Sequence, residues 1–126
     1  MSEVSKLVSV VVPVSNEQQG LPPLLDRLLP VLEASGERFE VLFVNDGSRD
    51  GSLEALRRLN ARDPRLKLVS FSRNFGKECA IAAGLAFARG DAVVMMDSDL
   101  QHPPEVIHEF LSLWRQGYEI VYGQRQ

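Results

Sequence analysis

Residues Leu7 to Val14 read LVSVVVPV, a β-branched run with almost no polar interruption. Such a run predicts a strand that is covered on both faces, as in a parallel sheet. Later segments repeat this character, and we expect strands there too: Phe39–Val44 (FEVLFV), Leu66–Phe71 (LKLVSF), Ala92–Met96 (AVVMM) and Glu119–Tyr122 (EIVY).

Segments of helical periodicity lie between these strands. The leucines from Leu21 to Ala34 recur at the spacing of one helix face, and Pro22 and Pro23 fit the first turn. Further helices are predicted after Asp50-Gly51-Ser52, over Lys77–Ala88 and from Pro103-Pro104 to about Gln116. Alternating strands and helices with right-handed crossovers predict an α/β fold: an open, mostly parallel Rossmann-like sheet with helices on both faces.

Composition restricts the class of protein. The chain has 126 residues, 44% of them hydrophobic and 25% charged, which fits a single globular domain. A formal net charge of -3 and a pI of about 5.4 argue against nucleic acid as a partner. The single cysteine, Cys79, cannot form an internal disulfide and is expected to be a small buried apolar residue in a reducing compartment.

Targeting signals are not evident in the sequence. Residues Met1 to Lys6 are short and polar, and the apolar run after them contains Pro13, which does not resemble a signal peptide. No apolar stretch approaches the roughly 20 residues needed to cross a bilayer. We therefore expect a cytoplasmic domain whose membrane contact is peripheral or lies elsewhere.

Polar residues follow four of the predicted strands, at the edge where the ligand site of this fold class lies. They are Ser15-Asn16-Glu17, Asn45 to Gly51, Ser72 to Lys77, and Asp97 to His102. Taken singly, Asn16, Asp46, Asp50 and Ser72 also fit helix caps or turns, which are commoner uses of such residues. Their convergence on one edge indicates a binding site.

Asp97, Asp99 and Gln101 alternate as the chain leaves a strand. Two carboxylates and an amide oxygen at this spacing suit a hard divalent cation, which commonly bridges to substrate phosphates. The alternative is a solvated acidic turn. No G-x-G-x-x-G follows the first strand, and Gly76-Lys77 lacks the rest of a phosphate-binding P-loop, so neither motif explains phosphate binding.

Four ordered motifs together resemble glycosyltransferase family 2, which has the GT-A fold. They are Val12-Pro13-x-x-Asn16-Glu17, Val44-x-Asp46-Gly47-Ser48-x-Asp50-Gly51, Ser72-Arg73-Asn74-Phe75-Gly76-Lys77, and Met96-Asp97-x-Asp99-Leu100-Gln101-His102-Pro103-Pro104. The likeness spans about Leu7 to Arg125. Within the family it is greatest to bacterial polyprenyl-phosphate sugar transferases related to dolichyl-phosphate mannose synthase.

The resemblance implies a role for each matching residue. It places Pro13, Ser15, Glu17 and Asp46 around the nucleoside, Asn74, Lys77 and Ser98 near the nucleotide sugar, Asp97, Asp99 and Gln101 on Mg2+ or Mn2+, and Arg125 near an acceptor phosphate. Asp97 and Asp99 are the expected catalytic residues. Two positions depart from the family pattern, which usually has Tyr at position 15 and Asp at position 45.

The resemblance implies an inverting, metal-dependent transfer from a UDP- or GDP-linked sugar to a polyprenyl phosphate. It further implies that residues 1–126 are the N-terminal nucleotide-sugar-binding part of a longer protein at the cytoplasmic face of the inner membrane, with possible self-association through an uncovered C-terminal edge. Three alternatives remain. The protein could be a family 2 transferase that acts on another acceptor such as a polysaccharide, a nucleotidyltransferase, or a non-catalytic nucleotide-binding module.

Overall fold

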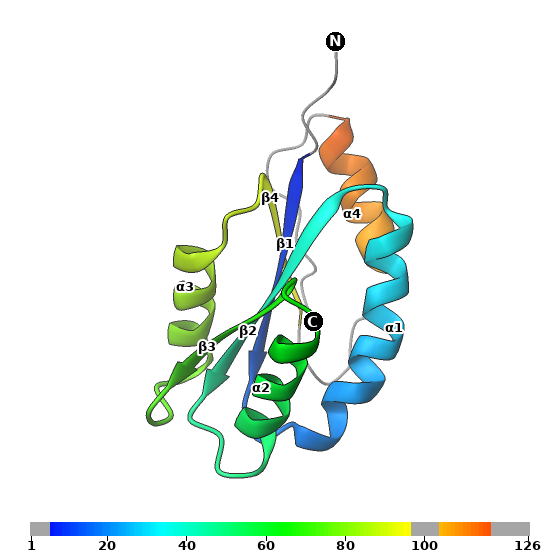
Figure 1. Cartoon of the computed structure of the whole chain (residues 1–126). Helices are drawn as coiled ribbons and strands as arrows, with labels where there is room; N and C mark the ends of the chain where they lie inside the picture. Colours follow the sequence, from blue (N-terminus) through cyan, green and yellow to red (C-terminus); the bar gives the residue numbers. More distant parts are fainter. Residues whose placement is uncertain (1–5, 97–103, 117–126) are drawn as a thin grey trace.

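The computed structural model describes residues 6–96 and 104–116, in which one sheet lies between helices (Figure 1). In chain order the elements are β1 (Leu7–Val14), the 3-10 turn η1 (Gln18–Gly20), α1 (Leu21–Ala34), β2 (Arg38–Asp46), α2 (Ser52–Arg62), β3 (Leu66–Phe71), α3 (Lys77–Phe87), β4 (Ala92–Met95) and α4 (Val106–Arg115). The predicted alternation is confirmed. The strand predicted at Glu119–Tyr122 lies outside the described residues.

The sheet is parallel and its strand order is β3-β2-β1-β4. From β1 the chain proceeds outward to β2 and β3, then returns to place β4 on the other side of β1. Right-handed crossovers in opposite directions put the connecting helices on opposite faces of the sheet. Accordingly, α1 and α2 lie on one face and α3 on the other (Figure 1).

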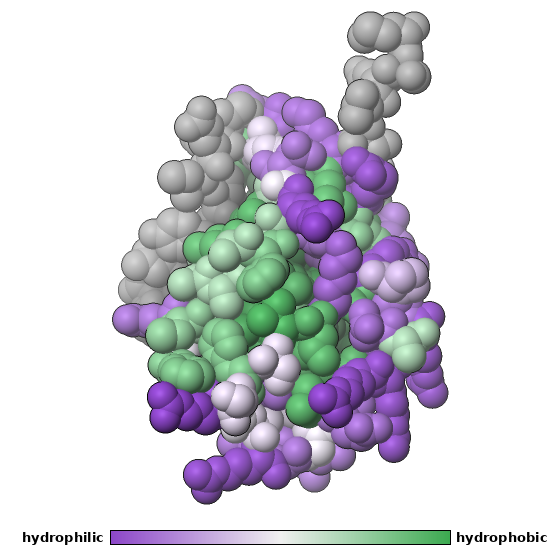
Figure 2. Space-filling model, turned by 60° about the vertical axis from the view of Figure 1, so that its left-hand side comes forward, coloured by the Kyte–Doolittle hydropathy of each residue, from purple (hydrophilic) through white to green (hydrophobic). Residues whose placement is uncertain are grey.

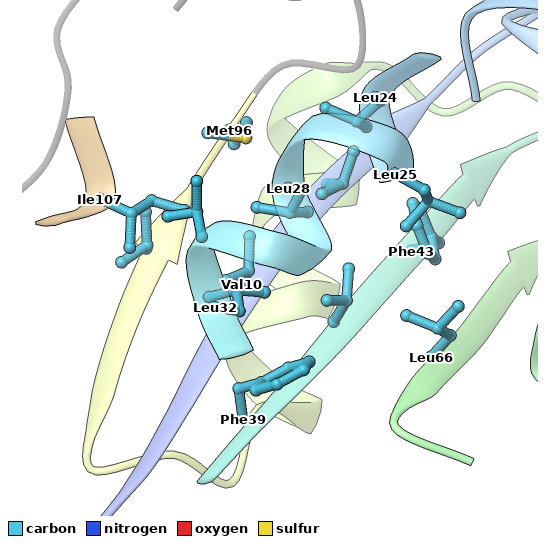
Figure 3. Close-up of a cluster of buried hydrophobic side chains, with 14 of the residues drawn as sticks. Val10, Leu24, Leu25, Leu28, Leu32, Phe39, Phe43, Leu66, Met96 and Ile107 are labelled. Atoms are coloured by element: carbon cyan, nitrogen blue, oxygen red, sulfur yellow. The ribbon is translucent and has the colours of Figure 1, made fainter. Parts of the chain in front are cut away.

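The main core lies between the sheet and helices α1, α2 and α4. Leu24, Leu28 and Leu32 of α1 are fully buried and belong to one cluster with Val10 of β1 (Figure 3). Burying a leucine side chain contributes about 1.5–3 kcal/mol relative to leaving it exposed. The leucine stripe seen in the sequence therefore fixes which face of α1 meets the sheet.

The opposite face is covered more thinly. Its buried cluster contains only Val11, Val44 and Ala80 among the described residues. After Lys77 and Glu78 in its first turn, helix α3 has no polar face, and Leu85 and Phe87 are 48% and 61% exposed. Figure 2, which brings this side of the molecule forward, shows a broad apolar area there.

Two details differ from the sequence prediction. Cys79 was expected to be buried, but it is exposed, because α3 buries only Ala80 and Gly84 and nothing in the described part of the chain covers its outer side. Strand β2 also extends further than predicted and ends at Asp46, whose backbone is therefore held in the sheet.

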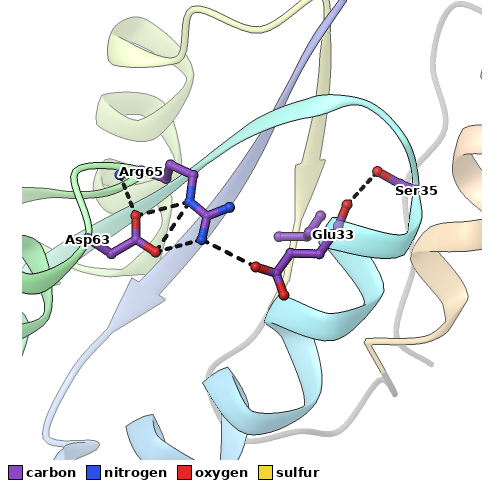
Figure 4. Close-up of polar contacts among 5 residues, drawn as sticks. Glu33, Ser35, Asp63 and Arg65 are labelled. Atoms are coloured by element: carbon purple, nitrogen blue, oxygen red, sulfur yellow. Dashed lines mark hydrogen bonds and ion pairs between the residues drawn. The ribbon is translucent and has the colours of Figure 1, made fainter.

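A polar contact lies at the edge of the sheet where the strands begin. Arg65 donates to both carboxylate oxygens of Asp63 and reaches Glu33 of α1 at 3.4 Å (Figure 4). Hydrogen bonds from Arg65 lower the pKa of Asp63. These partly exposed ion pairs contribute at most about 1 kcal/mol each and serve mainly to orient the loop before β3.

Within residues 6–96 and 104–116, no helix combines the length and the apolar character needed to cross a membrane.

Candidate nucleotide and metal site

The carboxyl edge of the sheet contains a topological switch point between β1 and β4. The chain leaves β1 toward β2 on one side, whereas β4 pairs with β1 on the other. In open α/β sheets, ligands bind in the crevice outside the carboxyl ends of the strands at such a point. The loops after β1 and β2 and the end of β4 therefore define the candidate site.

The loop after β1 is bound to the loop after β2 through Asn16. This is the only non-glycine residue with a positive φ (53°) in the described part of the chain. Its Oδ1 accepts hydrogen bonds from the backbone N–H groups of Arg49 (2.7 Å) and Asp50 (3.3 Å), and its own N–H donates to Ser48 Oγ (3.0 Å). Asparagine tolerates the left-handed conformation better than most residues, which explains its use here.

Further hydrogen bonds join the same two loops. The N–H of Glu17 donates to Ser52 Oγ (2.9 Å), and the N–H of Gln18 donates to Asp50 Oδ2 (3.2 Å). Asp50 Oδ1 also accepts from the N–H of Ser52 (2.9 Å), and hydrogen bonding with Ser52 is the main cause of the lowered pKa of Asp50. Asp50 thus has the structural, turn-forming role that the sequence left open.

The loop after β3 is held by Asp46, which is only 4% exposed. Its Oδ1 accepts from the N–H of Phe75 (2.7 Å), its Oδ2 from the N–H of Gly76 (3.0 Å), and its backbone carbonyl from Asn74 Nδ2 (3.2 Å). Asp46 and Asn74, both predicted site residues, are therefore in direct contact.

The other predicted residues that the structure describes stand along this edge. Pro13 lies at the end of β1, Ser15 and Glu17 in the loop after it, and Lys77 at the first position of α3. Ser15 and Lys77 are exposed, whereas Pro13 and Glu17 are partly buried. The structure thus gathers the predicted nucleoside side of the site on one connected set of loops.

The predicted metal ligands Asp97, Asp99 and Gln101 lie outside the described residues, as do Ser98, His102 and Arg125. Met96, the residue before this group, donates its N–H to the carbonyl of Val11 in β1 (3.0 Å). Within the described residues, 6–96 and 104–116, no three His, Cys, Asp or Glu side chains are grouped so that they could hold a metal ion.

Sequence reasoning missed the residues that connect the loops. Asn16 was noted as part of a motif and as a possible cap or turn residue, but not as a connection between two loops. Gln18, whose Oε1 accepts from the N–H of Gly51 (3.1 Å), was not singled out. The signal available for Asn16 was its type, since asparagine is enriched at positive φ. No pattern in the sequence indicates which amides its side chain would bind.

Comparisons with known proteins show what this chain is similar to. The family model described as Glycosyl transferase family 2 matches residues 9–126. The chain is 50% identical over 117 residues to a Bacillus subtilis protein named uncharacterized glycosyltransferase YkcC, covering 93% of this chain and 36% of that protein. It is 45% identical over 117 residues to the undecaprenyl-phosphate 4-deoxy-4-formamido-L-arabinose transferase of Pseudomonas syringae, covering 92% of this chain and 35% of that protein.

Among solved structures, a mannosyltransferase from Pyrobaculum calidifontis in complex with GDP-Man and Mn2+ is similar in fold. Its TM-score is 0.65 at 29% sequence identity, over 86% of this chain and 32% of that one. The chain thus spans little more than a third of the curated relatives it matches.

Proposed function

The chain belongs to glycosyl transferase family 2, and on this basis we propose that it forms the nucleotide-sugar-binding part of an inverting transferase that moves a sugar onto a polyprenyl phosphate. The observation that carries the proposal is the hydrogen-bonded carboxyl edge of the sheet, where the loops after β1 and β2 are joined and Asp46 at the end of β2 meets Asn74 of the loop after β3. The name of the Pseudomonas syringae relative, which specifies undecaprenyl phosphate, supports the acceptor class.

On the donor side, Pro13, Ser15, Glu17 and Asp46 face the nucleoside in this proposal. Both carboxylate oxygens of Asp46 already accept a backbone N–H, yet each keeps a second lone pair for a ligand hydroxyl or amide. Ser15 offers a hydroxyl group and little surface for stacking on a base. Recognition of the base therefore depends on hydrogen bonding more than on an aromatic contact.

On the diphosphate side, Asn74, Lys77 and Ser98 are the proposed contacts, and Asp97, Asp99 and Gln101 would hold Mg2+ or Mn2+. Two carboxylates and one amide form a set of hard oxygen donors, which fits these cations. When bound, such a cation neutralises charge on the departing nucleoside diphosphate. The complex of the Pyrobaculum calidifontis mannosyltransferase with GDP-Man and Mn2+ supports the pairing of nucleotide and metal.

The acceptor requires no strong general base in this scheme. A phosphate monoester has a second pKa near 6, so its oxygen is already ionised at neutral pH. Arg125 would orient that phosphate by charge-assisted hydrogen bonds. The whole protein would act at the cytoplasmic face of a membrane, where a polyprenyl phosphate is accessible.

A thermal-shift panel tests the donor proposal. UDP-, GDP- and dTDP-sugars are added with and without Mn2+, since a ligand that binds only the folded state raises the melting temperature. We expect one nucleotide series to raise it more with Mn2+ than without. Equal melting temperatures across the whole panel would contradict nucleotide-sugar binding.

A further inference from the structure

We propose that Asp46 is a positioning residue that fastens the segment Ser72–Gly76 to the end of β2. In this way it sets where Asn74 and Lys77 meet a nucleoside diphosphate. This inference rests on the proposed function for the identity of the ligand. The fastening itself depends only on contacts within the chain.

Three hydrogen bonds join Asp46 to one short segment, residues 74–76. Two consecutive backbone N–H groups, those of Phe75 and Gly76, donate to its two carboxylate oxygens at 2.7 and 3.0 Å. The Asn74 side chain donates to the Asp46 carbonyl at 3.2 Å. One buried residue of the sheet therefore binds three consecutive residues of the loop.

Gly47 brings the same two segments close enough for this to happen. Its φ is 65°, and a Cβ at this position would lie 2.3 Å from the backbone carbon of Arg73 and the backbone nitrogen of Asn74. Any side chain here would push the loop away from β2. The turn after β2 is thus shaped to receive the backbone of residues 73 and 74.

The aromatic contact next to this turn adds a second fixed point. Phe71, the last residue of β3, pairs with Asp46 in the register of the sheet, and its ring meets that of Phe75 edge to face at 5.5 Å between centroids. Residues 72–74 are consequently held at both ends. Lys77 follows directly as the first residue of α3, so its backbone position depends on the same fastening.

Only a carboxylate can fill this role fully. Two N–H donors need two acceptors, and an ionised Asp provides acceptors at both oxygens, whereas an Asn provides one acceptor and one donor. Removing the carboxylate leaves the N–H groups of Phe75 and Gly76 without their acceptor, and the segment loses both hydrogen bonds that hold its backbone to the end of β2. The loss would then be felt at Asn74 and Lys77 as well as at Asp46.

The first measurement is amide hydrogen exchange in the ligand-free protein. We expect Asp46→Ala to speed exchange at Phe75 and Gly76 by at least about tenfold, and Asp46→Asn to speed it at one of the two amides. Asp50→Ala is the matched control, because it removes a carboxylate from the loop that follows Asp46. The carboxylate of Asp50 accepts hydrogen bonds from Gln18 and Ser52, not from Phe75 or Gly76. It should leave exchange at Phe75 and Gly76 unchanged.

The second measurement separates positioning from direct contact with the nucleoside. Binding of uridine, guanosine, UDP and GDP is compared in the wild type, Asp46→Ala and Lys77→Ala. If Asp46 positions Lys77, the Asp46→Ala variant loses about tenfold more affinity for the bound diphosphate than for its nucleoside. In a Lys77→Ala background this extra loss should largely disappear: the double variant, compared with Lys77→Ala alone, should lose little more affinity for the diphosphate than for the nucleoside.

Equal losses for nucleoside and diphosphate, or unchanged exchange at Phe75 and Gly76, would overturn the positioning role. If Asp46→Ala does not fold, Asp46→Asn provides both measurements. Failure of the wild type to bind either UDP or GDP would contradict the proposed function, and the exchange measurement would still decide whether Asp46 fastens the segment.

Discussion

At the scale of single residues, side chains rather than regular secondary structure hold the carboxyl edge together. Asn16, Asp46 and Asp50 each accept backbone N–H groups from a loop other than their own or from the start of a helix. A side-chain acceptor satisfies amides that no strand or helix pairs, and it fixes the loop that carries them. The described part of the carboxyl edge is thus held by contacts within the chain itself.

The proposed metal dependence rests on Asp97 and Asp99. Replacing either by Asn keeps its size and removes the charge that a divalent cation requires, so we expect Mn2+-dependent affinity for UDP or GDP to fall by at least about tenfold. The melting temperature without ligand should not change. Calorimetric titration with and without Mn2+ measures this, with the exposed Glu109→Gln as control; full Mn2+-dependent affinity in either variant would contradict the assignment.

Glu40 is a buried carboxylate far from the candidate site. It is 2% exposed and accepts from Ser9 Oγ (2.6 Å), Lys67 Nζ (2.7 Å) and the Arg89 N–H (2.8 Å). Burial alone would raise its pKa, but these hydrogen bonds outweigh burial and the pKa is lowered. The ionised form therefore stabilises the folded chain.

The stability from Glu40 should depend on pH in a defined direction. Because its folded pKa lies below the usual 4.5, the contribution is present above that pH and is lost as the pH falls through the folded value. Glu40→Gln should lower the free energy of unfolding at pH 7 by roughly 1–3 kcal/mol and flatten its acid dependence. Urea unfolding between pH 7 and pH 3 tests this; an exposed-carboxylate variant, Asp26→Asn, should behave as the wild type.

At the scale of elements, α3 approaches the sheet more closely than an ordinary helix side chain allows. A Cβ on Gly84 would lie 2.3 Å from Val11 Cγ1. Val11 is fully buried, and its β-branched side chain has little freedom to change rotamer, so it cannot easily move aside. Gly84→Ala should therefore lower the free energy of unfolding by roughly 1–3 kcal/mol.

Ala86 provides the matched control for this contact, because it is exposed on the same helix. Ala86→Gly should cost about 1 kcal/mol from helix propensity alone. Chemical unfolding of both variants gives the comparison. Equal or greater stability of Gly84→Ala would show that α3 can move away from β1 without cost, contrary to the packing described here.

Most elements could be predicted from the sequence because their periodicity is strong. LVSVVVPV gave β1 with its observed bounds, and the leucine stripe gave α1. The outer side of α3 could not be predicted in this way. After Lys77 and Glu78 its alanine-rich sequence has no polar face, so burial of Cys79 was the reasonable expectation. Only the arrangement of the described helices around the sheet shows that none of them covers this side.

The sequence predicted which residues gather at the candidate site, but not which hydrogen bonds they form with one another. Polar residues after parallel strands must converge on one edge, so their grouping followed from the fold class. Which side chain binds which amide depends on turn geometry, such as the positive φ of Asn16 and Gly47. Spacing along the sequence does not contain that information.

At the scale of the whole molecule, the exposed apolar side of α3 predicts association between copies of this 126-residue chain. Leu85 and Phe87 are 48% and 61% exposed on a helix face that no described element covers, and exposed apolar patches of this kind promote association. A variant with serine at both positions should shift the sedimentation coefficient toward the monomer. Serine at Arg57 and Arg58, exposed on α2, serves as control; a wild-type chain that is monomeric at high concentration would contradict the prediction.

Sugar transfer demands more of the molecule than nucleotide binding does. The chain covers 36% and 35% of the two curated relatives compared above, so most of each relative has no counterpart in these residues. Transfer requires donor and acceptor to be held together with water excluded, which gives an effective concentration that separate binding cannot supply. The loops described here serve the donor side in our proposal.

We therefore expect residues 1–126 to bind a nucleoside diphosphate without transferring sugar. A chain extended to the length of the relatives should both bind the nucleoside diphosphate and transfer the sugar. A radiolabelled donor chosen from the thermal-shift panel, polyprenyl phosphate and Mn2+ provide the assay. The extended protein carrying Asp97→Asn controls for metal-independent hydrolysis of the donor. Transfer by the short chain at a rate comparable to that of the extended protein would place the acceptor site within these residues, because no outside segment would then be needed to bring the two substrates together.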